Sequence, residues 1–504
     1  MTLLSITYAL FLLSVLGIYW SFARQELRLW TLLIASLVFY ASLQVAYVPL
    51  MLIVVVINYW LGLAIGESAS LSQQAVASLS EEDWQFAQQD WNQRRLKTLW
   101  VGIILNILLL ISFKYVPFLL GTVGTWFNLA DVKSSASWVS ASLVAPLGLS
   151  FFCFECIAYL IDVYRGAPAT REFLPFAAYK LFFPKLISGP ITRYQPFLTQ
   201  LQTQTFPKPE RISEGLWLIA CGAVKKGLIA DRLNIFVNLS FDNMQRAGSG
   251  DLWLATFAYG LQLYLDFSGY VDIVRGSAIL LGFDLPENFD FPYFSANIAT
   301  FWRRWHMTLG DWLRNYLYFP LGGSRKGLLR TCVNLMIIML IAGIWHGAAW
   351  GFVVWGALHG LALVLHRLTD TQSAQFPWLK SWWQSWPGVA LAWLLTQVTV
   401  FTCWIFFRLP NLKDSGWVIA HLWGHQADAQ FVQKVYVDSI GLEPLQLAIV
   451  LWVLVALMAV AYAVNQGLKL QLSWTMKIML VPLCLYAVWL LSPDGSPPYI
   501  YFDF

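Results

Sequence analysis

The run Thr331-Cys-Val-Asn-Leu-Met-Ile-Ile-Met-Leu-Ile-Ala-Gly-Ile-Trp-His-Gly-Ala-Ala349 is apolar over most of its length. It has roughly the 20 residues that a membrane-spanning helix needs. One imidazole, that of His346, interrupts it near its end. An ionisable group inside such a segment is costly in a bilayer, and histidine can accept and return a proton near neutral pH. This run therefore predicts a membrane protein with chemistry inside its membrane domain.

The composition of the whole chain supports that class. Of 504 residues, 58% are hydrophobic, 16% aromatic and 12% charged, which is not typical of a soluble globular protein. We predict an all-α polytopic membrane protein with about twelve transmembrane helices. The expected spans are 3–22, 28–45, 46–66, 98–118, 138–163, 212–238, 252–282, 331–349, 351–366, 389–407, 445–465 and 476–492.

The distribution of Lys and Arg predicts the topology. The first basic residues, Arg24 and Arg28, follow the first expected span, so the positive-inside rule places the N-terminus outside. The loops 165–211 and 284–330 are rich in Lys and Arg and are expected in the cytoplasm. The net charge of +4 is then mainly a topology signal, and no nucleic-acid partner is expected.

The chain is expected to form one membrane-embedded domain over residues 1–504. Its one plainly polar insertion, about 67–97, is expected to be a cytoplasmic amphipathic helix around Trp84, Phe86 and Trp91. No cluster of Cys and His with ligand spacing accompanies Cys153-x-x-Cys156, so we expect no metal site.

Two further segments, 173–200 and 291–325, are too polar to cross a membrane and too aromatic and Pro-rich to be solvated loops. We expect re-entrant or interfacial helices here. Such elements occur at membrane depth where they are buried in protein or line a cavity. A cavity of this kind is a place for chemistry.

A second histidine ends the stretch Phe301-Trp-Arg-Arg-Trp-His306. If 301–325 begins as a helix, Trp302, His306 and Leu313 share one face, so His306 can point inward. Arg303 and Arg304 would remain available for an anionic donor. An interfacial anchor of Trp and Arg is the alternative interpretation.

Glycines surround His346 at four-residue spacing and predict close helix packing there. They are Gly343, Gly347 and Gly351, followed by Gly356 and Gly360. His346 could instead make a structural hydrogen bond across a helix interface. For the remaining histidines we expect structural or surface roles: His359, His366, His421 and His425.

Several carboxylates lie within expected spans, where they must be protonated or paired. These are Glu155, Asp162, Asp266 and Asp272. We expect arginine partners for them, and Arg275, Arg303 and Arg304 are the candidates.

Five stretches together resemble the membrane-bound O-acyltransferase family: Phe182–Arg193, Tyr264–Asp272, Pro286–Tyr293, Phe301–Gly323 and Ile344–Gly360. The similarity is dense over about 180–366. Within the family the chain most resembles the bacterial alginate O-acetylation branch, and more distantly the D-alanyl transfer protein of teichoic acid modification. Asn315 and Ser324 depart from residues that are common in relatives.

The resemblance implies a ring of helices around a central tunnel, where a cytoplasmic acyl thioester meets an acceptor from outside. An O-acyltransferase, expected to be an O-acetyltransferase of a bacterial inner membrane, would use His346 as general base and His306 to position the donor or to stabilise developing oxyanion charge. The donor would be acetyl-coenzyme A or an acyl carrier protein, with no permanently bound cofactor. Expected donor-binding residues are Arg303, Arg304, Trp302, Trp305, Asn315 and Trp345.

Membrane lipids would surround the chain, and the acceptor would be a secreted polysaccharide or a relay hydroxyl on an extracytoplasmic partner protein. Two other classes stay open. The chain could transport an acyl-bearing carrier, although it shows no internal repeat of the kind that many transporters have. It could also be a scaffold subunit for a separate extracytoplasmic transferase.

Overall fold

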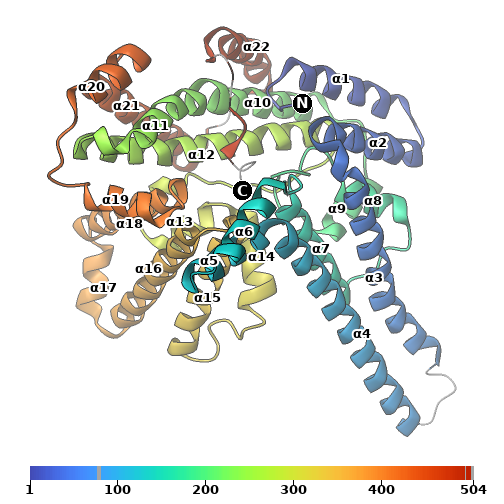
Figure 1. Cartoon of the computed structure of the whole chain (residues 1–504). Helices are drawn as coiled ribbons and strands as arrows, with labels where there is room; N and C mark the ends of the chain where they lie inside the picture. Colours follow the sequence, from blue (N-terminus) through green and yellow to red (C-terminus); the bar gives the residue numbers. More distant parts are fainter. Residues whose placement is uncertain (76–80, 143, 471, 494, 496, 501–504) are drawn as a thin grey trace. The chain divides into compact units, whose positions relative to one another are not determined.

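The computed structural model describes all residues except 76–80, 143, 471, 494, 496 and 501–504 (Figure 1). The all-α prediction is confirmed, because helices joined by turns and loops make up the described chain. Two compact units can be distinguished. The first holds Met1–Gly215 with Ser277–Pro286, and the second holds Leu216–Gly276 with Glu287–Phe504. The expected single domain over 1–504 stays a prediction.

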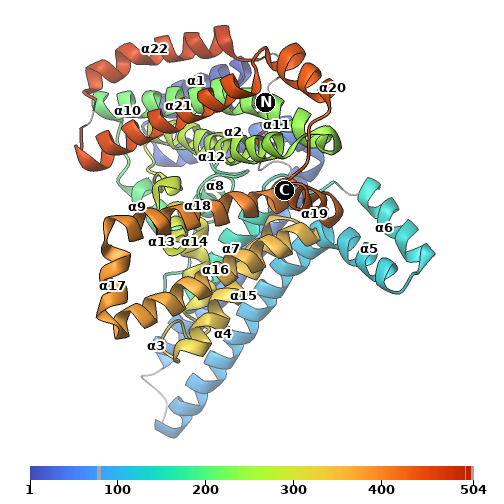
Figure 2. The same ribbon diagram turned by 90° about the vertical axis from the view of Figure 1, so that its left-hand side faces the viewer.

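The first unit consists of helices of mixed length. They are α1 Ile6–Ser21, α2 Gln25–Gln44, α3 Val48–Ala75, α4 Glu81–Leu110, α5 Val116–Trp126, α6 Ala130–Ser142, α7 Leu149–Tyr164, α8 Phe173–Lys180 and α9 Tyr194–Gln202. Short π-helical turns continue α4 over Ile111–Tyr115. Helices α3 and α4 run side by side in both views (Figures 1 and 2).

The insertion 67–97 falls on the ends of α3 and α4, whose backbones are helical up to Ala75 and from Glu81. The amphipathic face predicted around Trp84 and Phe86 lies outside the side chains that the structure describes. By contrast, every residue from 175 to 192 is buried. This segment therefore has the burial that its sequence led us to expect.

The second unit carries the remaining helices. They are the end of α10 Pro209–Ala223, π-helical Val224–Ala230, α11 Asp231–Asp242, α12 Ser249–Leu280 up to Gly276, α13 Ile298–Arg304, α14 Met307–Leu313, π-helical Arg314–Tyr318, α15 Leu328–His346, α16 Trp350–Gln375, α17 Pro377–Gln384, α18 Trp386–Arg408, α19 Leu412–Ala420, α20 Ala429–Phe431, π-helical Val432–Ile440, α21 Pro444–Tyr462 and α22 Trp474–Leu491. A π-helical turn over Ala463–Gly467 continues α21, and short 3₁₀ turns lie at Met244–Arg246 and Pro292–Phe294.

By length and composition, seven described segments could cross a membrane, and the chain is a multi-pass membrane protein. They are Gln25–Gly66, Gln89–Trp126, Leu328–His346, Trp350–Gln375, Trp386–Arg408, Pro444–Gly467 and Trp474–Leu491. The expected first span corresponds to a shorter apolar helix, Ile6–Ser21.

Three other expected spans are not among these seven segments, because each has a break or charged residues. The span 138–163 is interrupted by non-helical residues before Leu149. The span 212–238 carries a π-helical turn with Lys225 and Lys226. The span 252–282 is one helix, but it contains two aspartates and an arginine. Charge and helix breaks therefore separate these segments from the seven apolar ones.

Glycines let α15 and α16 pack closely, as their spacing predicted. A Cβ on Gly343 would collide with the Phe352 carbonyl and lie 3.2 Å from Gly356 Cα. Gly347 and Gly351 lie beyond the end of α15 and act differently. A Cβ on Gly347 would overlap the Phe352 ring, and one on Gly351 would lie 2.5 Å from Pro410 Cα.

Candidate active site

His346 is the last residue of α15 and is 2% exposed. Its imidazole lies among aromatic rings from three helices. The ring centroids of Trp345, Trp355 and Phe407 are 4.9, 5.2 and 5.1 Å away, respectively. The helix end therefore places the histidine in an apolar site formed by α15, α16 and α18.

His306 is buried, but the local backbone differs from the helix that its sequence spacing predicted. The continuous helix expected from residue 301 is wrong, because α13 ends at Arg304 and α14 begins at Met307. His306 stands between them with φ 45° and ψ 54°, a left-handed conformation that is uncommon outside glycine. The inward direction was predicted correctly, and the break in the chain produces it.

Asn288 stabilises this break from a neighbouring segment. Its carbonyl accepts a hydrogen bond from the Met307 N–H at 3.0 Å. Its Oδ1 accepts from the Thr308 N–H at 3.0 Å and from Thr308 Oγ1 at 2.7 Å. These bonds satisfy backbone donors that the first turn of α14 leaves free, as an N-cap side chain does.

The two histidines lie close together. The His306 imidazole, 1% exposed, has its centroid 6.5 Å from that of His346 and 6.0 Å from that of Trp345. That separation exceeds what a direct hydrogen bond between two imidazoles would give. Burial lowers the pKa of His306 to about 3, so this ring is neutral at working pH. A neutral imidazole offers one donor and one acceptor nitrogen.

The predicted aromatic donor residues divide between the site and the core beside it. Trp345 contacts both catalytic candidates, as described above. Trp302 lies edge-on to Trp355, with centroids 5.6 Å apart. Trp305 is 1% exposed and packs on Phe301 with centroids 5.6 Å apart. Trp305 therefore supports the segment from within the core.

The predicted polar donor residues make local contacts instead. Arg303 is exposed and donates to the Ala299 carbonyl and to Thr300 Oγ1, both at 3.3 Å. Arg304 pairs with Asp290 at 3.6 Å. Asn315 donates to the Asp311 carbonyl at 2.8 Å. None of these contacts involves His306 or His346.

His359 was assigned a structural role from the sequence, but it lies beside this site. It is 0% exposed, and its centroid is 4.8 Å from that of Trp355, the ring that also flanks His346. The four-residue spacing of Trp355 and His359 on one helix was the available signal. That spacing does not predict how closely Trp302 of α13 approaches His359.

The prediction of arginine partners is wrong for Asp266 and Asp272. Lysines take that role, with Lys226 2.6 Å from Asp266 and Lys225 2.7 Å from Asp272. Lys226 also lies 2.8 Å from Asp231. The π-helical turn over Val224–Ala230 brings residues five apart together, a spacing that α-helical reasoning does not anticipate.

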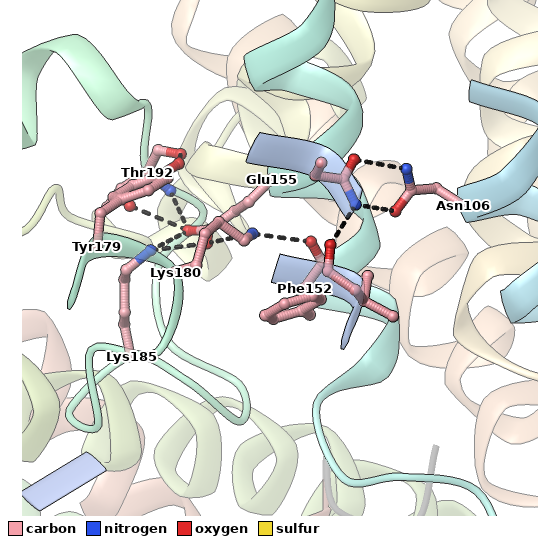
Figure 3. Close-up of polar contacts among 9 residues, drawn as sticks. Asn106, Phe152, Glu155, Tyr179, Lys180, Lys185 and Thr192 are labelled. Carbon is pink, nitrogen blue, oxygen red and sulfur yellow. Dashed lines mark hydrogen bonds and ion pairs between the residues drawn. The ribbon is translucent and has the colours of Figure 1, made fainter. Parts of the chain in front are cut away.

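Among the residues that the structure describes, lysines and not arginines pair with Glu155 (Figure 3). Lys185 donates to both carboxylate oxygens at 2.6 and 2.7 Å, and Lys180 lies 3.3 Å away. Thr192 donates to Glu155 through its N–H and its hydroxyl, both at 3.0 Å. We call Glu155, Lys180, Lys185 and Thr192 the Glu155 clamp. It fastens the buried segment 181–192 to α7.

Comparison with known proteins agrees with the predicted resemblance. The sequence profile of the membrane-bound O-acyltransferase family matches residues 30–403. The chain is 34% identical to a protein of Pseudomonas putida described as a probable alginate O-acetylase, over 98% of each sequence. It is 34% identical to a peptidoglycan O-acetyltransferase of Helicobacter pylori, over 78% of this chain and 74% of that protein.

A more distant relative is a teichoic acid D-alanyltransferase of Bacillus subtilis. It is 26% identical over 53% of this chain and 70% of that protein. The profile match covers all three buried histidines described above. Both the family and its branches were therefore predicted correctly from the sequence motifs.

Proposed function

This chain belongs to the membrane-bound O-acyltransferase family and is an O-acetyltransferase, and from that premise we propose that it transfers acetyl from a cytoplasmic thioester to a hydroxyl outside. The acceptor is a secreted or cell-surface polysaccharide, or a relay hydroxyl on a partner protein. The observation that carries the proposal is the approach of two buried histidines, His306 and His346, to 6.5 Å.

His346 is the general base in this mechanism. It removes the proton of the acceptor hydroxyl as the oxygen attacks the thioester carbonyl. The new C–O bond forms, the C–S bond breaks, and the proton passes from His346 to the leaving thiolate. The aromatic rings around His346 exclude water, so that hydrolysis does not compete with transfer.

His306 positions the donor. Its ring is neutral, so it can donate one N–H to the thioester without bringing a buried charge into the site. Arg303, which is exposed, would attract the phosphates of coenzyme A or of an acyl carrier protein. We place this donor side in the cytoplasm of a bacterial inner membrane, with the N-terminus outside.

Acetyl transfer by the purified full-length chain in lipid vesicles tests the proposal. Vesicles would receive acetyl-coenzyme A labelled in the acetyl group on one side and a soluble hydroxyl acceptor on the other. We expect labelled ester that is lost in His346→Ala. Label that crosses without forming an ester would instead identify a transporter, and neither movement nor transfer would identify a scaffold subunit.

Cysteine labelling tests the donor side separately. On a background without native cysteines, a cysteine near Arg325 should be protected from a membrane-impermeant thiol reagent added outside, whereas one near Gln426 should react. This prediction rests on the difference in Lys and Arg content between the two loops. Labelling in the opposite sense would place the thioester outside.

A further inference from the structure

A compact group of aromatic side chains surrounds His359 next to His346. We call His359, Trp302, Trp355 and Trp404 the His359 cluster. The centroids of the three indoles lie 5.1, 4.8 and 6.1 Å from that of His359, in that order. Helices α13, α16 and α18 contribute these residues. Trp355 joins the cluster to His346, because its ring is 5.2 Å from that imidazole.

Within the part of the chain that the structure describes, the polar atoms of this cluster lack hydrogen-bond partners. They are the Nε1 atoms of Trp302, Trp355 and Trp404 and both ring nitrogens of His359. All are buried, and His359, Trp355 and Trp404 are at most 1% exposed. Buried polar groups in proteins are normally hydrogen-bonded, so four side chains of this kind within one cluster point to a ligand that supplies the partners.

The chemistry of the cluster restricts that ligand. An indole nitrogen only donates, and a neutral imidazole donates once, so the ligand must present an acceptor. The rings in contact with His359 carry no formal charge, and a buried ion would lack a counterion among them. The ligand group is therefore a neutral oxygen acceptor.

An acyl carbonyl fits these requirements better than a sugar does. Trp355 and Trp404 are nearly fully buried, which leaves no exposed indole face for a sugar ring to stack on. Trp302 is half-buried and forms the more open side of the cluster. The proposed reaction at His346 requires a thioester carbonyl close to that imidazole, and Trp355 of the cluster flanks it.

We propose that the His359 cluster is the subsite for the acyl carbonyl of the thioester, an inference that rests on the proposed function. Its N–H groups donate to the carbonyl oxygen of the bound thioester. When the acceptor oxygen attacks, the same donors stabilise the negative charge that develops on that oxygen. The C–O bond forms and the C–S bond breaks as before, and the cluster itself exchanges no proton.

Infrared spectroscopy of a bound thioester tests this directly. The probe is S-acetylpantetheine with a ¹³C carbonyl, because coenzyme A and acyl carrier proteins share this part. It would be bound to full-length His346→Ala protein, which should not consume it. We expect the carbonyl band at lower wavenumber than for the probe in detergent alone. Trp302→Phe, which keeps a ring and removes one N–H, should reduce the shift.

Kinetics supply the second readout. His359→Phe should lower kcat by roughly 10²-fold, the scale for losing an oxyanion donor, with a smaller change in KM. His359→Gln, whose amide can donate, should recover part of the loss. Trp383→Phe is the matched control, because Trp383 Nε1 is also buried without a partner among the described residues, but its indole lies on α17. It should leave both the rate and the band unchanged.

The outcomes separate the two proposals. Wild-type protein that forms no ester would refute the proposed function. Ester formation that depends on His346, together with unchanged kcat in His359→Phe and Trp302→Phe, would overturn the subsite alone. If His359→Phe does not fold, the carbonyl band of Trp302→Phe decides: a reduced shift supports the subsite, and an unchanged shift refutes it.

Discussion

The Glu155 clamp and the His359 cluster are both buried polar groups, one in each unit, and they differ in how their polar atoms are satisfied. In the clamp, Glu155 accepts from Lys185 at 2.6 Å and from Thr192 at 3.0 Å. In the His359 cluster, the ring nitrogens have no partner among the described residues. The clamp is complete without a ligand, whereas the cluster is not.

This difference distinguishes a buried polar network that stabilises the fold from a buried polar group that can bind a ligand. A satisfied network of charges fixes one backbone arrangement, because removing any member leaves another group unpaired. An apolar site with free donors has the opposite property, because it gains most when a ligand arrives. We therefore expect changes in the Glu155 clamp to affect folding, and changes around His346 and in the His359 cluster to affect turnover.

Removing the clamp carboxylate should have the largest effect, and it should act on folding. Glu155→Ala leaves two buried lysines without their counterion, and breaking such a buried pair costs about 3–5 kcal/mol. We expect little folded protein in detergent by size-exclusion chromatography. A normal yield and thermal midpoint would show that the clamp is dispensable.

Thr192→Val is the matched control for the clamp. It removes one neutral hydroxyl donor to Glu155 and leaves the two lysines paired with it. The expected loss is about 1 kcal/mol, the usual contribution of one such hydrogen bond. A loss as large as that of Glu155→Ala would mean that charge pairing is not what stabilises the segment.

Gly347→Leu should act on the histidine site instead. A side chain here would overlap the Phe352 ring, immediately after His346. Because small displacements of a catalytic group cost about 10²-fold, we expect transfer to fall by at least that factor, with some loss of folded yield.

Gly416→Leu is the control, since nothing lies within 4 Å of a Cβ at that position. Its transfer rate should match the wild-type rate. A well-expressed and fully active Gly347→Leu protein would show that the glycines do not shape the site.

His306→Ala should have a smaller and mixed effect. Loss of one neutral donor should weaken thioester binding by up to about tenfold, as well as slow turnover. Combined with His346→Ala, the free-energy loss should be less than the sum of the single losses, because both rings serve one centre. Calorimetry and single-turnover kinetics on the three variants would measure this. Normal binding and turnover in His306→Ala would leave that residue a structural role.

Much of this fold followed from sequence because periodicity and apolar length report on helices directly. The all-α class and the close packing at Gly343 were predicted from local pattern. The approach of His306 to His346 was only implied by the family resemblance. No local signal placed residues forty positions apart within 6.5 Å.

The failures have a common physical cause, which is that tertiary contacts decide non-α geometry. Asn288 caps the start of a new helix at Met307, so the continuous helix through His306 was wrong. Lys225 and Lys226 of the π-helical turn pair with Asp272 and Asp266, for which arginine partners were expected. The position of His359 beside the ring that flanks His346 was not predicted, because its environment comes from three separate helices.

The central claim is that His346 accepts the proton in acyl transfer, and one comparison tests it most directly. Single-turnover transfer should be measured in folded His346→Ala protein alongside thioester binding by calorimetry. The account predicts normal insertion and donor affinity with a rate lower by roughly 10²–10⁴-fold, the scale for removing a general base. A rate close to wild type in folded, donor-bound His346→Ala protein would contradict it.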